Sequence, residues 1–112
     1  MKAPLPLPQD RKLTVVLRVE PGCLGPNGKD HVDAFCSFAQ DKAQSLDSHF
    51  LDWEIVPRHD KALPEIQYRV ANKNLSHAQA AKYLEVFNRN IDEFEEDLHD
   101  RLAVLINQFL GQ

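Results

Sequence analysis

The sequence predicts a small α+β domain with the element order β-α-β-β-α, in which two helices cover one face of a three-stranded sheet. Three observations support this fold class. Three short segments alternate apolar and polar residues, which is the period of strands. A fourth segment repeats apolar residues every three or four positions, which is the period of a helix. The end of the chain repeats that helical pattern without a glycine or proline until Gly111, so one long C-terminal helix is expected.

The length and the first residues predict one domain with an N-terminal tail. The 112 residues suit a single domain, because domains most often contain about 100–150 residues. Residues 1–10 alternate proline with apolar residues, and proline fixes φ and removes an amide donor. We therefore expect an extended, proline-rich tail over 1–10 and a single α+β domain over 11–112.

The first half of the domain is predicted to contain a strand, a loop and a helix. The strand covers residues 13–20, in which four apolar side chains share one face: Leu13, Val15, Leu17 and Val19. Residues 21–28 hold three of the four glycines of the chain and therefore form a loop. A helix follows over 30–47, with Asp30 as its N-cap.

Two further strands are predicted over 50–56 and 66–70, where apolar and polar residues again alternate. The polar segment 57–65 is expected to link them as antiparallel neighbours, although it is long for a hairpin loop, which usually has about 2–5 residues. With a right-handed crossover from the first strand to the second, the third strand lies in the middle of the sheet. This arrangement resembles half of a ferredoxin-like sandwich, with both helices on one face.

The C-terminal helix is predicted to run from Ser76 to Leu110. Ser76 and Gln79 have the spacing of a capping box, which marks the start of a helix. At about 1.5 Å per residue this helix would be ~50 Å long, whereas strands of about seven residues give a sheet of only ~23 Å. The second half of the helix would therefore have no sheet beneath it.

That second half still carries an apolar stripe, and burying each such side chain contributes about 1.5–3 kcal/mol. Two structures would cover the stripe: the helix bends back onto its own domain, or it packs on a second copy of the chain. We favour the homodimer, because sharp helix kinks usually have a glycine or proline as their cause. The predicted dimer interface consists of Leu98, Leu102, Leu105, Ile106 and Phe109.

Composition and charge exclude several classes of protein. A hydrophobic fraction of 43% and a charged fraction of 27% are typical of globular proteins and argue against wholesale disorder. No apolar stretch approaches the ~20 residues that cross a bilayer, and the N-terminal residues lack the pattern of a secretory signal, so we expect a soluble, cytoplasmic protein without a membrane partner. The net charge of -4, with acidic residues concentrated in 92–100, disfavours generic nucleic-acid binding.

The glycine-rich loop is the best candidate for a ligand site. Backbone amides in such a loop and at the start of a helix can bind an anion, and a lysine adds positive charge. The loop is not a nucleotide P-loop, because Cys23 and Asp30 occupy positions that need glycine and Ser or Thr. A plain connector, whose glycines only allow positive φ, is the alternative interpretation. The predicted ligand-binding residues are Cys23, Gly25, Asn27, Gly28 and Lys29.

The segment from Gly25 to Gly28 also contains the pattern G-x-x-G, and a helix, two strands and a helix are predicted after it. In these two features the chain resembles the KH family of RNA-binding domains, whose G-x-x-G loop clamps a nucleic-acid backbone. The resemblance implies a binder of single-stranded nucleic acid. The chain departs from the family in lacking a helix before the loop, in having a proline inside it and in its acidic balance.

The two cysteines do not predict a metal site. Cys23, His31 and Cys36 have the spacing Cys-x7-His-x4-Cys, which matches no zinc signature. Cys36 lies on the apolar stripe of the first predicted helix and is expected to be a buried thiol. Cys23 precedes a helix N-terminus, where a thiolate is stabilised, and is the candidate for a reactive thiol.

Two histidines stand next to aspartates, as His59-Asp60 and His99-Asp100. Catalysis needs groups that converge in a pocket, whereas adjacent residues of one element generally point apart. We expect both pairs to be solvated surface residues. We therefore predict no catalytic residue, no bound metal and no cofactor.

The sequence thus favours a small non-enzymatic homodimer that acts as an interaction or ligand-binding module for an unidentified small molecule or protein. One alternative is an enzyme that uses a thiol or an anion site in the loop 21–29. The other alternative is a KH-like binder of single-stranded nucleic acid. The enzyme alternative requires Cys23 or the loop amides to be chemically active.

Overall fold

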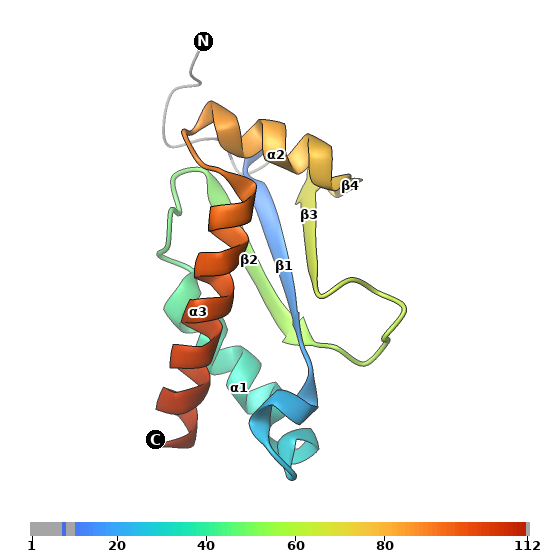
Figure 1. The fold of residues 1–112 in the computed structure, drawn as a ribbon, viewed down its shortest axis with the longest axis vertical. Helices are drawn as coiled ribbons and strands as arrows, with labels where there is room; N and C mark the ends of the chain where they lie inside the picture. The colour runs from blue at the N-terminus through green and yellow to red at the C-terminus, as the bar shows by residue number, and fades with distance from the viewer. Residues whose placement is uncertain (1–7, 9–10, 112) are drawn as a thin grey trace.

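The structure is a computed structural model in which Pro8 and residues 11–111 are described, so the predicted tail lies almost wholly outside the described residues. The described residues form an α+β domain, as predicted, with a mixed sheet and a long C-terminal helix (Figure 1). The first half contains β1 (Leu13–Val19), the 3-10 helix η2 (Pro21–Leu24), α1 (Gly28–Ala43) and β2 (Leu51–Pro57). The second half contains β3 (Ile66–Val70), β4 (Lys73–Leu75), α2 (His77–Val86) and α3 (Ile91–Leu110).

The strands form one sheet with the order β2-β1-β3-β4. β1 runs parallel to β2 and antiparallel to β3, so the predicted sheet, with the third strand in the middle and paired with the second, is wrong. β1 takes the centre because its residues are buried on both faces apart from Thr14. β2 alternates apolar residues with Asp52 and Glu54, and charged side chains of this kind suit an edge strand.

The predicted sheet also lacks β4, which forms a hairpin with β3. The two residues of the turn, Ala71 and Asn72, have φ angles of 51° and 65°. Positive φ at both positions is the geometry of a type I′ turn, which sequences usually mark with Asn-Gly or Asp-Gly. Here alanine stands first and the strand has only 3 residues, so neither the turn nor an alternating pattern indicated the strand.

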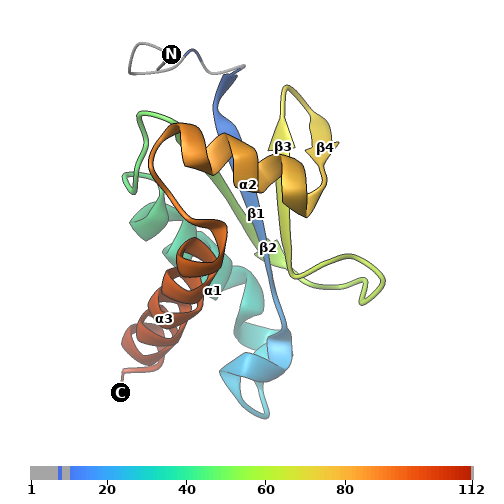
Figure 2. The ribbon, with the colours of Figure 1, turned by 45° about the horizontal axis from the view of Figure 1, so that its top comes forward.

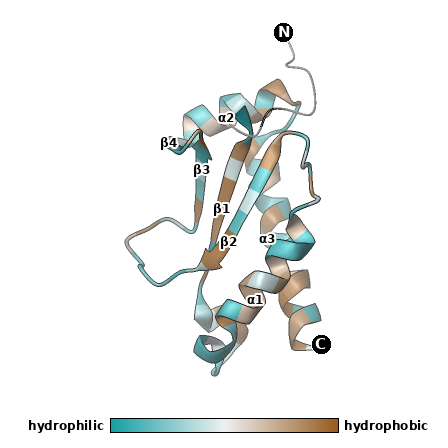
Figure 3. Cartoon of the chain, turned by 180° about the vertical axis from the view of Figure 1, so that it is seen from behind, coloured by the Kyte–Doolittle hydropathy of each residue, from teal (hydrophilic) through white to brown (hydrophobic). Residues whose placement is uncertain are grey.

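α2 and α3 lie over one face of the sheet, α1 lies against the edge strand β2, and the helices and strands enclose a single apolar core (Figure 2). The opposite face carries polar side chains that bind one another. Arg18 donates a hydrogen bond to Gln67 at 2.8 Å, and Arg69 forms an ion pair with Glu54 at 3.4 Å. Figure 3 shows this face from behind, with the strands uncovered by helices.

α1 starts and ends a few residues earlier than predicted. Its residue Gln40 binds backbone groups on the edge of β2 that faces away from β1. Gln40 Nε2 donates a hydrogen bond to the Trp53 carbonyl oxygen at 2.7 Å. The Ile55 amide donates in turn to Gln40 Oε1 at 2.9 Å. One side-chain amide therefore takes the place that a neighbouring strand would occupy.

The predicted continuous helix over 76–110 is wrong, because the chain turns between α2 and α3. Asn88 adopts a left-handed backbone conformation with φ 60°. Asn90 is the N-cap of α3, and its Oδ1 accepts a hydrogen bond from the Glu93 amide at 3.1 Å. Asparagine tolerates the left-handed region and is a preferred N-cap, so two asparagines produce the bend without glycine or proline.

Because of this turn, α3 runs back toward α1 on the same domain (Figure 1). The Phe109 ring lies 5.5 Å from the ring of Phe35 and 5.7 Å from that of Phe38. The residues predicted for a dimer interface therefore contact their own domain. Leu98 is buried, and four are half-buried against the core: Leu102, Leu105, Ile106 and Phe109. The bend back onto the same domain, which we favoured less than the homodimer, therefore covers part of the apolar stripe.

Candidate functional site

The predicted ligand loop connects β1 to α1 and is organised by its own hydrogen bonds. The Cys23 amide donates a hydrogen bond to the Glu20 carbonyl at 3.0 Å, and the Gly25 amide donates one to the Gly22 carbonyl at 3.2 Å. The Gly28 amide donates to the Gly25 carbonyl at 3.0 Å. These three amides therefore have partners within the loop.

The glycines of this loop have local reasons for being glycine. Gly25 has φ 93°, which side chains rarely allow. Gly28 is buried at the start of α1, and a Cβ atom there would lie 1.7 Å from the Pro21 carbonyl oxygen. Asn27 and Lys29 are exposed beside them. The structure thus places the predicted residues together at the surface, and their role in ligand binding stays a prediction.

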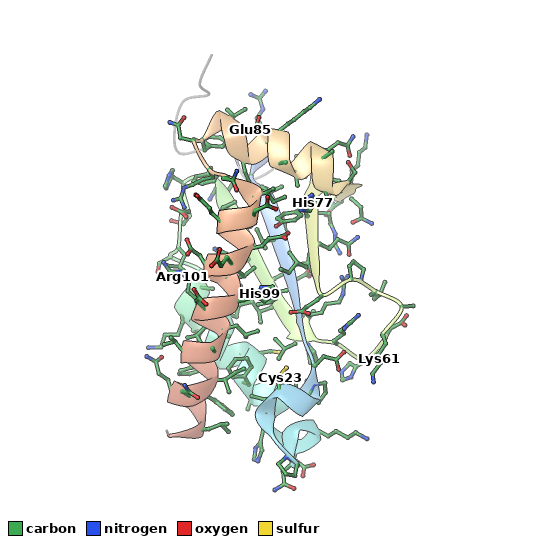
Figure 4. All side chains as sticks on the ribbon, viewed as in Figure 1. Cys23, Lys61, His77, Glu85, His99 and Arg101 are labelled. Carbon is green, nitrogen blue, oxygen red and sulfur yellow. The ribbon has the colours of Figure 1, made fainter. Side chains whose placement is uncertain are left out.

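The two thiols have opposite environments. Cys23 is exposed in η2 (Figure 4), whereas Cys36 is buried in the core. Burial, with a smaller contribution from the nearby charge of Asp33, raises the pKa of the Cys36 thiol to about 11. Cys36 is therefore almost entirely protonated at pH 8, and reactivity follows the thiolate.

Thiol labelling tests this difference. With Ellman's reagent at pH 8, the native protein is expected to react rapidly at one thiol per chain, and a Cys23→Ser variant is expected to react only after unfolding in urea. A native reaction at two thiols would contradict the burial of Cys36. The same measurement repeated from pH 6 to 10 gives the pKa of Cys23, and a value well below the usual ~8.5 would favour the enzyme alternative.

Two histidines pair with glutamates from other elements, which the sequence did not indicate because the partners are far apart in the chain. His77 Nε2 lies 3.7 Å from Glu95 Oε1, and the Tyr68 hydroxyl donates to Glu95 Oε2 at 2.7 Å. Burial raises the pKa of Tyr68 well above its usual value, and the hydrogen bond to Glu95 and the charge of Glu95 raise it further. His99 Nε2 lies 3.3 Å from Glu65 Oε1, on the side of α3 that faces β3 (Figure 4). Both histidine contacts are largely exposed to solvent, so they contribute little to stability.

The described residues contain no group of three or more His, Cys, Asp or Glu side chains arranged to hold a metal ion. Within the same residues, no helix combines the length and the apolar character needed to cross a membrane. No known protein family, curated protein or solved structure matches this chain. The arguments for its function therefore come from its own surface.

Two adjoining cavities lie between α3 and the end of α1 with the segment that follows it. The larger, of about 350 Å³, has a mixed lining of four apolar residues and four polar or charged ones. The smaller, of about 160 Å³, contains the Arg89–Asp47 ion pair. Leu46 and Arg101 belong to both cavities. The charged residues around them balance in number, so neither sign of ligand is favoured: Lys42, Arg89 and Arg101 against Asp47, Asp97 and Asp100.

The C-terminal half of α3 forms an uncharged surface, which is the candidate site. From Leu102 to Gly111 no residue is charged, and this end of α3 is largely brown in Figure 3. Val104 is 54% exposed and Leu110 is 38% exposed, although surface helices usually turn charged residues toward water. The preceding part of α3 carries six carboxylates instead: Asp92, Glu93, Glu95, Glu96, Asp97 and Asp100.

Three apolar residues of this half follow one another at four-residue steps and share one side of the helix: Leu102, Ile106 and Leu110. We call them the α3 ridge. Leu102 and Ile106 are half-buried, and Leu110 is exposed. The sequence indicated the first two as interface residues, whereas Leu110 was not among the residues predicted for the interface.

Proposed function

We propose that this protein is a non-enzymatic interaction module that forms a homodimer through the C-terminal half of α3. The observation that carries the proposal is the lack of charge from Leu102 to Gly111 on a helix whose outer side chains remain exposed. Exposed apolar patches of this kind mark interaction sites, and an uncharged patch packs against another without burying an unpaired charge. A second copy offers a matching patch by symmetry.

Energetics support the proposal. The contact of Phe109 with α1 covers one side of α3, but it leaves Val104 and Leu110 exposed. Full burial of one such side chain contributes about 1.5–3 kcal/mol. In a symmetric contact every residue of the patch is buried twice, once in each copy.

The remaining chemistry of the described residues supports a binding role over catalysis. Cys36 is buried, and the loop amides of Cys23, Gly25 and Gly28 bind loop carbonyls. The charges around the two cavities balance. Catalysis needs groups that converge on a reacting atom, and these features do not supply such a set.

The proposal predicts the mass of the protein in solution. At micromolar concentration, light scattering after size exclusion should give about twice the 12.8 kDa of one chain. Leu110→Glu should give the monomer mass, because it places a charge in the uncharged surface. Val86→Glu is the matched control, since Val86 is 47% exposed but lies on α2. It should remain a dimer.

A monomeric wild-type protein at these concentrations would refute the homodimer. If Leu110→Glu leaves the dimer intact, the interface does not lie on the C-terminal half of α3. Circular dichroism of both variants establishes that they are folded, which is expected because each residue is already exposed to solvent.

A further inference from the structure

We infer that Asn27 is a site of spontaneous covalent modification, at which the side-chain amide is lost and the residue becomes aspartate or isoaspartate. The reaction requires an asparagine with a free side chain and a following residue whose backbone nitrogen is open to attack. Asn27 is exposed, and Gly28 after it has no Cβ atom beside that nitrogen. The site lies in the loop between β1 and α1, at the end of the domain opposite α2 (Figure 1), and is independent of the proposed homodimer.

The sequence context distinguishes Asn27 from the other asparagines. It alone, of the six asparagines in the chain, precedes a glycine. The other five precede residues with large side chains, which hinder approach to the backbone nitrogen: Asn72, Asn74, Asn88, Asn90 and Asn107. The structure also explains why residue 28 is glycine, since a Cβ atom there would lie 1.7 Å from the Pro21 carbonyl oxygen. The packing of η2 against α1 therefore requires a glycine directly after Asn27.

The side chain of Asn27 does not cap the helix that it precedes. Asn27 is the N-cap of α1, where an asparagine usually accepts a hydrogen bond from an amide of the first turn. It makes no such bond. Asn90, at the equivalent position of α3, does accept one from the Glu93 amide. The α1 amides therefore do not hold the Asn27 side chain away from the backbone of Gly28.

The reaction has two steps. In the first, the Gly28 backbone nitrogen loses its proton and attacks Cγ of Asn27. A bond forms between these atoms, the bond from Cγ to Nδ2 breaks, and ammonia leaves with the proton. Ring closure joins neighbouring groups of one chain, so it proceeds without an enzyme. In the second step, water opens the cyclic imide. Attack at Cγ gives aspartate, and attack at the main-chain carbonyl gives isoaspartate.

The first turn of α1 controls how fast the ring closes. The Gly28 amide donates a hydrogen bond to the Gly25 carbonyl at 3.0 Å, and this bond must open before the nitrogen attacks Cγ. Helix ends open locally at a much lower free energy than the whole fold. We therefore expect the native protein to react more slowly than the unfolded chain, and faster at Asn27 than at its other asparagines.

The two products differ in their effect on the loop. Both add a carboxylate beside Lys29 and make the net charge of -4 one unit more negative. Aspartate is a preferred N-cap and is stabilised by the helix N-terminus, so α1 keeps its start. Isoaspartate inserts a methylene group into the main chain and displaces Gly28, which lies tightly against Pro21. Isoaspartate therefore disturbs the contact between η2 and α1.

Peptide mapping of aged protein tests the site. Trypsin places each of the six asparagines in a different peptide, and Asn27 lies in peptide 19–29. After incubation at 37 °C, mass spectrometry should show the replacement of an amino group by a hydroxyl in this peptide several times more often than in the other five. The rate should rise from pH 6 to pH 9, because the attacking nitrogen must lose its proton. Two products of equal mass are expected, and the peptide from Asn27→Asp identifies the aspartate form.

Asn27→Gln is the matched control, because glutamine would have to close a larger ring and should leave peptide 19–29 unchanged. The urea-unfolded protein gives the rate for a free Gly28 amide. If the unfolded chain is converted and the native protein is not, the first turn of α1 protects Asn27 and the inference is overturned. Conversion of another asparagine as fast as Asn27 would also overturn it. So would aspartate as the sole product, because direct hydrolysis of the side chain forms no isoaspartate.

Discussion

Replacing Gly28 with alanine is expected to lower the free energy of unfolding by about 3 kcal/mol, the upper part of the range for overpacking. The added Cβ atom would lie 1.7 Å from the Pro21 carbonyl oxygen and 2.6 Å from its carbon. Both are backbone atoms, so no side-chain rotation relieves the contact. η2 would have to move away from the start of α1, and Leu24, which η2 inserts into the core, would move with it.

Gly22→Ala is the matched control for this change, because a Cβ atom at Gly22 would meet nothing within 4 Å. Urea unfolding followed by circular dichroism measures both variants. The control should stay within about 0.5 kcal/mol of the wild type, as surface substitutions usually do. Equal stabilities for the two variants would mean that η2 and α1 do not pack as closely as the structure has them.

Replacing Gln40 with leucine is expected to cost about 2–4 kcal/mol. Leucine fills a similar volume but neither donates to the Trp53 carbonyl nor accepts from the Ile55 amide. Leaving a partly buried backbone group without a partner costs about 1–3 kcal/mol, and here two groups lose theirs. Gln40→Glu should fall between leucine and the wild type, because a carboxylate still accepts from Ile55 but cannot donate to Trp53.

Gln44→Leu is the control for Gln40, since Gln44 is exposed just beyond the end of α1. Urea unfolding gives the stabilities, and amide hydrogen exchange reports the local effect. Exchange at Ile55 should accelerate in Gln40→Leu and remain unchanged in Gln44→Leu. Unchanged exchange at Ile55 in both variants would show that the Gln40 side chain does not close the edge of β2.

The strands were predictable where the pattern of burial was simple. The third predicted strand, 66–70, has the bounds of β3, and the first, 13–20, ends one residue beyond β1. The capping box of Ser76 and Gln79 is confirmed at the start of α2. Each of these features depends on neighbours in the sequence. The order of the strands depends on which strand has two buried faces, and alternation along one strand does not reveal that.

The bend between α2 and α3 shows why the rest was missed. We treated glycine and proline as the signals of a break, whereas Asn88 and Asn90 produce it through a left-handed residue and an N-cap. Two asparagines followed by Glu93 were a readable signal for a second helix start. The candidate surface on α3 was likewise visible as an apolar stripe. How much of it remains exposed depended on the packing of Phe109 against α1.

The edges of the sheet limit how this protein can aggregate. An unpaired strand edge is a template on which further chains can add, and growth of that kind has no natural end. Gln40 binds two backbone groups on the edge strand β2, and the other edge strand is β4, which has only 3 residues and begins with Lys73. A two-fold contact through a helix, in contrast, is closed by symmetry and stops at two copies. The chain can therefore present an apolar helix face without inviting open-ended polymerisation through its sheet.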